Sequence, residues 1–457
     1  MVTLSPDLQV MASLSPDLPD ELVHEILFRL PPDEPACLFR LSVLSNPWRS
    51  LLSDPEFHHN YRKFNRSPPM LGFIYNSEVS SVSHFVPTTG PCPPCTFEPQ
   101  PADFIVCDCR HGRVLLDNGE VSMELVVWDP MTGRRKDLSD PCRSLFYLGT
   151  AVLCAVYGCD HATCHDGPFH VVFVRIDAEA GSATAYKYSS ETGEWSTPTS
   201  ELALFEEHDI VVEPDLIDEL GPVDDGAALH SVLVEDSLHF LLMSGPQGSR
   251  ILKYDVGRHF LSVIVLPAAV HYRSTILMAT EDGRLGVAHL DRLILHLWSR
   301  EVGPDGVAAW AEYRVIGLMP FLPIGDPAIK VELIGSVEGA NIIFATTSLG
   351  VYAIDLKLLR SRKLCEGQAI RPFFPFMSFY YPGDLGKLYE LLVCVKVIIS
   401  SACPAKDVTV CKDSGLCRIL YNLTGLKVFN IQLPSLCTAI FDAAISYGVG
   451  NGERVCF

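Results

Sequence analysis

The chain has 457 residues, and 48% of them are hydrophobic, so it can bury a sizeable core and form more than one domain. Its 55 acidic and 35 basic residues give a formal net charge of −20, which disfavours nucleic acid and anionic membranes as partners. Sixteen cysteines without a secretory leader favour reduced thiols, and the longest apolar run (388–402) is interrupted by charges, so we expect a soluble protein of the cytosol or nucleus.

Three short helices are predicted after an N-terminal stretch, residues 1–14, that we expect to be disordered. The first begins near Pro19, because proline is tolerated in a first helical turn, and it ends at Pro31. Its apolar residues recur at helical spacing and form one stripe. These are Leu22, Val23, Ile26, Leu27 and Leu30.

The second and third helices follow at once. Leu38 and Leu41 repeat at helical spacing in the second helix. Asn46 and Pro47 are a typical cap and first helical residue for the third, which carries Trp48 and which we expect to end at Pro55.

A unit of three short helices is too small to be stable without help. Its surplus of apolar faces predicts that something else completes its core. Another protein could do so, or the helices could cap the chain's own β domain.

The residues of these helices resemble an F-box. The resemblance rests on Leu18-Pro19-Asp20-Glu21-Leu22, on Ile26-Leu27-Phe28-Arg29-Leu30-Pro31, and on Trp48-Arg49 with Leu51-Leu52-Ser53-Asp54-Pro55. The wider run to Phe73 is similar to plant F-box proteins that carry a large β domain behind the box. One stretch departs from the family, because Leu44-Ser45-Asn46-Pro47 stands where a Cys or Ser and basic residues usually precede the tryptophan.

The resemblance implies a partner and a role. The box of this family binds a Skp-type adaptor and through it a cullin, and the domain behind the box captures a target protein for a ubiquitin ligase. Carried over, the expected adaptor-binding residues are Leu18, Pro19, Leu22, Ile26, Leu30, Pro31, Leu41 and Trp48. Of these, Leu22, Ile26, Leu30 and Pro31 contribute to the interface or to the core of the box, and Trp48 packs under the third helix.

Beyond residue 61 the pattern changes to β-strands. Residues 61–103 read as a linker with the first strands, and residues 104–383 as a β-repeat domain. Five units of several strands each are predicted within it, at 104–138, 153–199, 231–266, 276–319 and 331–364. Glycines at Gly133, Gly193, Gly283, Gly339 and Gly350 suit the tight turns between strands.

Repeats of this scale indicate propeller blades, kelch-like or WD-like, each covered by its neighbours. An open stack of β-sandwich type fits the same pattern. The predicted fold class is therefore α+β multidomain, with a small three-helix F-box followed by a large all-β, propeller-like domain. Residues 384–457 depart from the repeat and are richer in cysteine, and we interpret them as an atypical tail of altered splicing.

One cluster has metal-ligand chemistry. Cys159, His161, Cys164 and His165 could supply part of a tetrahedral site, but they lack the spacing of a zinc finger, so an ordinary polar loop is the favoured interpretation. Cys92-Pro-Pro-Cys95 has redox spacing without the strand and helix that would activate it. We therefore predict no metal and no cofactor.

Catalytic motifs are missing from the sequence, because no nucleophile elbow, phosphate loop or dinucleotide pattern has its supporting context. We expect a protein that is not an enzyme, and any ubiquitin transfer would be performed by its partners. Three alternatives stay open: a scaffold independent of a ligase, a ligand- or glycan-binding propeller with aromatics such as Trp195 and Trp298 around a pocket, and an oxidase-type propeller. The target protein cannot be named from the sequence.

Overall fold

The structure is a computed structural model of the whole chain. It describes the residues 20–44, 46–76, 83–88, 104–118, 124–139, 141, 147–156, 158–159, 161, 164, 167–177, 181–199, 201–203, 231–245, 248–270, 274–323, 329–366 and 373–380. Among them, a helical unit ends at Ser67 and a β unit runs from Pro68 to Phe379. The predicted N-terminal stretch 1–14 and the tail 384–457 lie outside the described residues.

Four helices make up the described part of the helical unit, one more than predicted. They are α2 (Asp20–Phe28), α3 (Pro35–Leu44), α4 (Asn46–Leu52) and α5 (Pro55–Asn65). The third predicted helix ends before Pro55 as expected, at Leu52, but Pro55 also begins α5, which was not predicted. Asp54 caps this helix by accepting a hydrogen bond from the Glu56 amide at 2.9 Å, and Pro55 occupies the first turn.

The helical core combines residues from all four helices. Its buried apolar side chains are Leu27, Leu38, Leu41, Leu52, Phe57 and Tyr61. The Tyr61 hydroxyl donates to the Leu30 carbonyl at 2.9 Å, so α5 is tied to the end of the first helix. The ring of Phe28 stacks on Phe57 with centroids 5.3 Å apart, which explains an aromatic residue among polar positions of α2.

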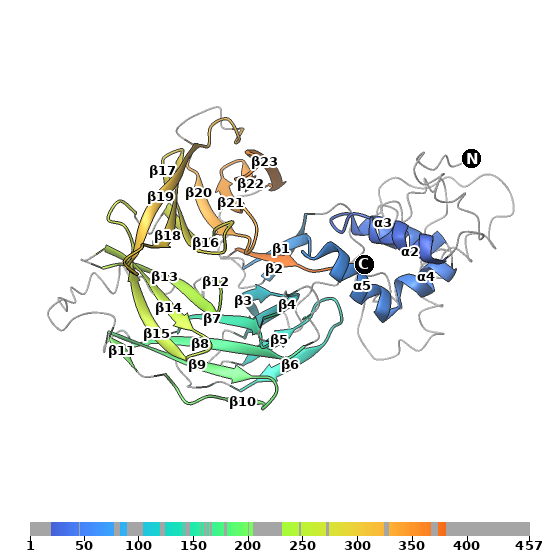
Figure 1. Ribbon diagram of the computed structural model, residues 1–457, viewed down its shortest axis with the longest axis horizontal. Coiled ribbons are helices and arrows are strands. Elements are labelled where there is room, and N and C mark those ends of the chain that lie inside the picture. Colours follow the sequence, from blue (N-terminus) through green and yellow to red (C-terminus); the bar gives the residue numbers. More distant parts are fainter. Residues whose placement is uncertain are drawn as a thin grey trace, which may run out of the picture. The chain divides into compact units, whose positions relative to one another are not determined.

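The β unit consists of six antiparallel sheets, and five of them are built from consecutive strands (Figure 1). The first holds β3 (Ile105–Arg110), β4 (Arg113–Asp117), β5 (Leu125–Trp128) and β6 (Arg135–Leu138). The second holds β7 (Tyr147–Cys154), β8 (Phe169–Asp177), β9 (Ser182–Ser189), β10 (Glu194–Trp195) and β11 (Leu202–Ala203). The third holds β12 (Ser231–Val234), β13 (Ser237–Gly245), β14 (Gly248–Asp255) and β15 (Phe260–Val265).

The fourth and fifth sheets repeat this arrangement. The fourth holds β16 (Thr275–Ala279), β17 (Leu285–Asp291), β18 (Ile294–Val302) and β19 (Ala308–Gly317). The fifth holds β20 (Glu332–Ser336), β21 (Ile342–Thr347), β22 (Gly350–Asp355) and β23 (Arg360–Cys365). These five sheets correspond to the five predicted units, and all five predicted turn glycines have a positive φ. At Gly350 a Cβ would lie 2.3 Å from the Cys365 carbonyl oxygen, so glycine is required there.

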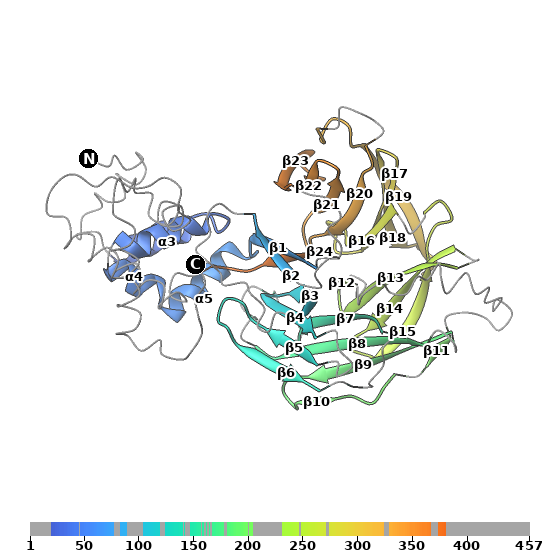
Figure 2. The same ribbon diagram turned by 180° about the vertical axis from the view of Figure 1, so that it is seen from behind.

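The sixth sheet joins strands from the two ends of the β unit. It holds β1 (Met70–Asn76), β2 (Ser83–Pro87) and β24 (Phe373–Met377) in the order β2-β1-β24. The strands β3, β7, β12, β16, β20 and β24 each contact the next, and β24 contacts β3. The sheets therefore close into a six-bladed β-propeller (Figure 2). The closure comes from β24, which pairs with β1.

Most of the core lies between neighbouring blades. One cluster of buried residues joins the β3–β6 sheet to the next, and others follow between successive sheets around the ring. Where the propeller closes, the ring of Phe373 in β24 stacks on that of Phe73 in β1, with centroids 4.6 Å apart. It also contacts the ring of Phe344 in β21 in a tilted arrangement, with centroids 4.3 Å apart. Each blade thus covers the apolar face of its neighbour, as predicted for a propeller rather than an open stack.

Among the described residues, none of the helices combines the length and the apolar character that crossing a bilayer requires.

Candidate functional site

The apolar stripe of helix α2 is buried on one side and exposed on the other. Leu22 is 50% exposed, whereas Leu27 of the same helix is fully buried. Val23 and Ile26 are half-buried beside Leu22. An exposed leucine costs free energy in water, so this surface is suited to cover by another molecule.

The other expected adaptor-binding residues are placed differently from one another. Leu30 is half-buried in the turn after α2, and Pro31, the next residue, is exposed. Trp48 of α4 is half-buried, while Leu41 of α3 is only 1% exposed and packs inside the helical core. Leu18 and Pro19 lie outside the described residues. The structure thus brings Leu22 and Ile26 together on one helix and assigns Leu41 an interior position.

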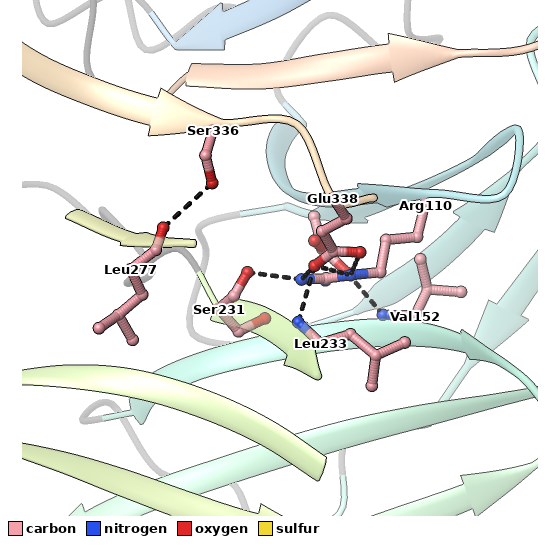
Figure 3. A network of polar contacts seen from close by, with 8 residues as sticks. Arg110, Val152, Ser231, Leu233, Leu277, Ser336 and Glu338 are labelled. Carbon is pink, nitrogen blue, oxygen red and sulfur yellow. Dashed lines mark hydrogen bonds and ion pairs between the residues drawn. The ribbon is translucent and has the colours of Figure 1, made fainter. Parts of the chain in front are cut away.

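A buried ion network lies where the innermost strands of the propeller meet (Figure 3). Arg110, at the end of β3, donates from Nε to both carboxylate oxygens of Glu338 at 3.0 and 3.1 Å, and its Nη1 pairs with Asp108. Its Nη2 donates to the Ser231 carbonyl at the start of β12. Glu338 lies in the turn between β20 and β21, so one guanidinium connects three blades.

The two carboxylates extend the network to further backbone groups. Asp108 accepts a hydrogen bond from the Val152 amide of β7 at 2.7 Å, and Glu338 accepts one from the Leu233 amide of β12 at 2.8 Å. Four of the six blades are therefore joined through three charged side chains. This arrangement holds the ring together and leaves the guanidinium fully engaged.

The three charges respond differently to burial. Burial lowers the pKa of Arg110, but the Asp108 and Glu338 charges outweigh this and raise it overall. Burial raises the pKa of Asp108 more than Arg110 and the Val152 amide lower it. Burial also raises the pKa of Glu338, yet Arg110 and the Leu233 amide bring it below its ordinary value. The two partners differ because Arg110 is shared, Asp108 is the more deeply buried carboxylate, and Glu338 receives more of the hydrogen bonds.

The two tryptophans that were considered for a ligand pocket lie apart. Trp195 of β10 packs against Tyr188 in the cluster between the first two blades and donates to the Ser139 carbonyl at 2.7 Å. Trp298 of β18 packs against a different cluster, between the third and fourth sheets. These two aromatics therefore do not line a common pocket.

Cysteine and histidine side chains gather in the loop after β7. Cys159, His161 and Cys164, which the sequence singles out, lie together with Cys154, the last residue of β7. Cys154 was missed because it belongs to the strand rather than to the loop motif. His165 and the pair Cys92 and Cys95 lie outside the described residues. Burial, then the neighbouring cysteines, raise the pKa of the Cys164 thiol.

Comparison with known families identifies the helical unit. The model of the F-box domain matches residues 15–60, which include α2, α3, α4 and the first half of α5. The chain therefore contains an F-box domain followed by a six-bladed β-propeller.

Curated relatives are plant F-box proteins. The chain is 22% identical to F-box protein At5g03970 of Arabidopsis thaliana over 315 residues, which cover 62% of this chain and 65% of the relative. It is 30% identical to the F-box/kelch-repeat protein At3g17280 of the same plant over 126 residues, or 26% of this chain and 31% of the relative. The matched region thus spans less than two thirds of either relative's length.

Similarity to solved structures is weak. The WD40 domain of SCAP from fission yeast matches 59% of this chain and 52% of its own chain, with 12% identity and a TM-score of 0.32. The β-propeller domain of the Trilobed protease from Pyrococcus furiosus covers 56% of this chain and 80% of its own, with 10% identity and a TM-score of 0.29. Similarities at this level carry no argument about function.

Proposed function

Because the chain has an F-box domain and a six-bladed propeller behind it, we propose that it is the substrate-recognition subunit of an SCF-type ubiquitin ligase. The F-box docks on a Skp-type adaptor, which links it to a cullin, and the propeller binds a target protein for ubiquitination. The F-box match at residues 15–60 is the single observation that carries this proposal. The chain itself performs no chemistry in this role. We place the role in the cytosol or nucleus.

The docking surface centres on α2. Leu22 is half exposed in the free chain, and Ile26 lies half-buried beside it on the same helix. Covering the exposed part of Leu22 in a complex removes apolar area from water and so contributes to binding. Leu18 and Pro19 before the helix, Leu30 and Pro31 after it, and Trp48 extend the proposed surface, and Leu41 supports it from the core.

The propeller supplies the second binding surface. A closed ring of blades is a rigid scaffold whose connecting loops can vary without loss of the core, so target recognition belongs to the loops. The net charge of −20 favours a target that is not a polyanion. The similarity to an F-box/kelch-repeat protein supports the proposal that one part of the chain docks on the adaptor and a repeat domain binds the target.

The proposal is tested with the purified full chain and a purified Skp-type adaptor. Leu22→Asp places a charge on the docking surface, and we expect it to weaken adaptor binding by about 30-fold, equivalent to about 2 kcal/mol. Val302→Asp is the matched control, because Val302 is 71% exposed on the propeller strand β18. It should bind the adaptor like the unaltered chain.

Two outcomes contradict the proposal. One is an unaltered, folded chain that does not bind the adaptor, and the other is equal binding by the Leu22→Asp and Val302→Asp variants. The target is sought separately, by affinity purification with and without a proteasome inhibitor. Proteins that accumulate on the chain only when the proteasome is inhibited are the expected targets, and accumulation on the Leu22→Asp variant without inhibitor would confirm that the adaptor drives their loss.

A further inference from the structure

The loop between β7 and β8 gathers four side chains with metal-ligand chemistry. The sulfur atoms of Cys154, Cys159 and Cys164 and a ring nitrogen of His161 all lie within 4.8 Å of one another. All three cysteines are free thiols. We propose that these four residues form a structural zinc site.

The distances within the cluster suit a tetrahedral ion. With Zn–S bonds of about 2.3 Å and Zn–N bonds of about 2.0 Å, two ligand atoms of a tetrahedral site lie about 3.6 Å apart, and two sulfurs slightly further. The Cys164 sulfur and the His161 Nδ1 are 3.6 Å apart. The cluster therefore needs only a small contraction to enclose an ion, with His161 coordinating through Nδ1.

The donor set selects zinc. Three thiolates and one imidazole form one of the standard structural zinc sets, and four protein ligands leave no open position for catalysis. Soft sulfur donors disfavour magnesium and calcium, which prefer oxygen. The site thus has a stabilising rather than a catalytic role.

Backbone amides already point at two of the sulfurs. The Val156 amide donates to the Cys154 sulfur and the His161 amide to the Cys159 sulfur, each at 3.4 Å and each from two residues further along the chain. Such hydrogen bonds fix the direction in which each sulfur faces. Cys154 and Cys159 thus have the same local backbone contact.

The loop is also held from outside. Arg113, a buried residue of β4 in the neighbouring blade, donates from Nη2 to the carbonyls of Cys164 and Gly167 at 2.8 and 2.7 Å. Cys154 is fixed by its position in the β7–β8 ladder, opposite Phe169. A zinc ion there would pin a long loop against the adjacent blade.

A disulfide is the competing use of these thiols. Three cysteines leave one thiol over after any pairing, and a disulfide would not engage the His161 Nδ1 that lies 3.6 Å from the Cys164 sulfur. The cluster of four is therefore better satisfied by one ion than by one covalent bond.

Metal analysis of the purified full chain, without a histidine tag, tests the proposal. We expect about one zinc ion per chain from this site, and Cys164→Ser should lower the zinc content by about that amount. Cys365→Ser is the matched control, because Cys365 is a free cysteine at the end of β23 and outside the cluster. It should keep its zinc.

A second measurement uses the unaltered chain, so it does not depend on whether a variant folds. Cobalt(II) added to the metal-free chain should give the intense visible bands of a tetrahedral site and the near-ultraviolet bands of thiolate ligands, and zinc should abolish them. Equal zinc in the Cys164→Ser and Cys365→Ser variants, absence of the cobalt bands, or a disulfide between two of the three cysteines would overturn the site. Adaptor binding is measured separately and is not expected to depend on the metal.

Discussion

Arg110 connects three blades through a single side chain that is only 5% exposed. The guanidinium has two carboxylate partners and a carbonyl, so its burial is matched by charge and by hydrogen bonds. Removing one partner of such a pair is costly, because the remaining charges stay buried without compensation. Arg110 therefore matters for the stability of the propeller mainly because, without it, the carboxylates of Asp108 and Glu338 would lie buried without a cation.

Arg110→Met tests this at the residue scale. We expect it to lower the free energy of unfolding of the propeller by about 3–5 kcal/mol, measured by urea unfolding. Arg284→Met is the matched control, because Arg284 pairs with Asp282 and Glu301 while half exposed, and its loss should cost at most about 1 kcal/mol. Equal costs for the two variants would refute a structural role of the buried network.

Glu338→Gln tests the charge of the same network. Folding lowers the pKa of Glu338 below its ordinary value of 4.5, so its charge stabilises the fold above pH 4.5 and this contribution is lost as the pH falls through the folded-state pKa. The variant should be about 1–3 kcal/mol less stable than the unaltered chain at pH 7. The difference should shrink below pH 4.5, and a difference independent of pH would contradict the ion pair.

Among the elements, α5 is the helix that the sequence did not predict. Ser53-Asp54-Pro55-Glu56 ends one helix and starts another, and proline is compatible with both. The sequence alone predicts an end at Pro55, because proline stops a preceding helix, and it does not reveal the helix start at the same residue. Tertiary contacts settle it, since Phe57 and Tyr61 of α5 complete a core that three helices leave open.

Tyr61→Ala tests the contribution of α5. Truncating this buried ring should destabilise the helical unit by about 3–5 kcal/mol, seen as faster amide exchange in α2 to α5 of the full chain. Phe64→Ala is the matched control, because Phe64 lies in the same helix and is exposed. Since residues 15–60 end before Tyr61, an isolated fragment with that boundary should also lose its fold. A stable fragment would contradict the four-helix core.

The sequence predicts which residues can take part in a site, but not always where the fold places them. Apolar spacing identified Leu22, Ile26 and Leu41 equally well, because it reports which residues avoid water and not which molecule covers them. Packing of α3 against the other helices then buries Leu41 and leaves Leu22 exposed. In the same way, the loop motif identified Cys159, His161 and Cys164, along with His165, which lies outside the described residues. Only the β7–β8 pairing brings Cys154 to the first three.

For the whole molecule, ring closure was the feature beyond reach of the sequence. Five blades are made of consecutive strands and were identified by their repeat, but the sixth combines β1 and β2 with β24. These strands are far apart in the chain, and no local pattern pairs them. The aromatic contacts of Phe373 with both Phe73 and Phe344 make the closure visible only in three dimensions.

Phe373→Ala tests the closure. The aromatic ring of Phe373 is fully buried between two blades. Its loss should therefore destabilise the propeller by about 3–5 kcal/mol and speed amide exchange first in β1 and β24. Phe260→Ala is the matched control, because Phe260 of β15 is 57% exposed, and it should be close to neutral. Exchange that stays slow in β1 and β24 of the Phe373→Ala variant would contradict closure by these strands.

The most direct measurement is amide hydrogen exchange of the full chain with and without a purified Skp-type adaptor. Docking through the F-box predicts slower exchange in α2 and in the turn that follows it, with the propeller strands unchanged. Unchanged exchange in α2 at saturating adaptor, or protection confined to the propeller, would contradict a ligase subunit that docks through its helical unit.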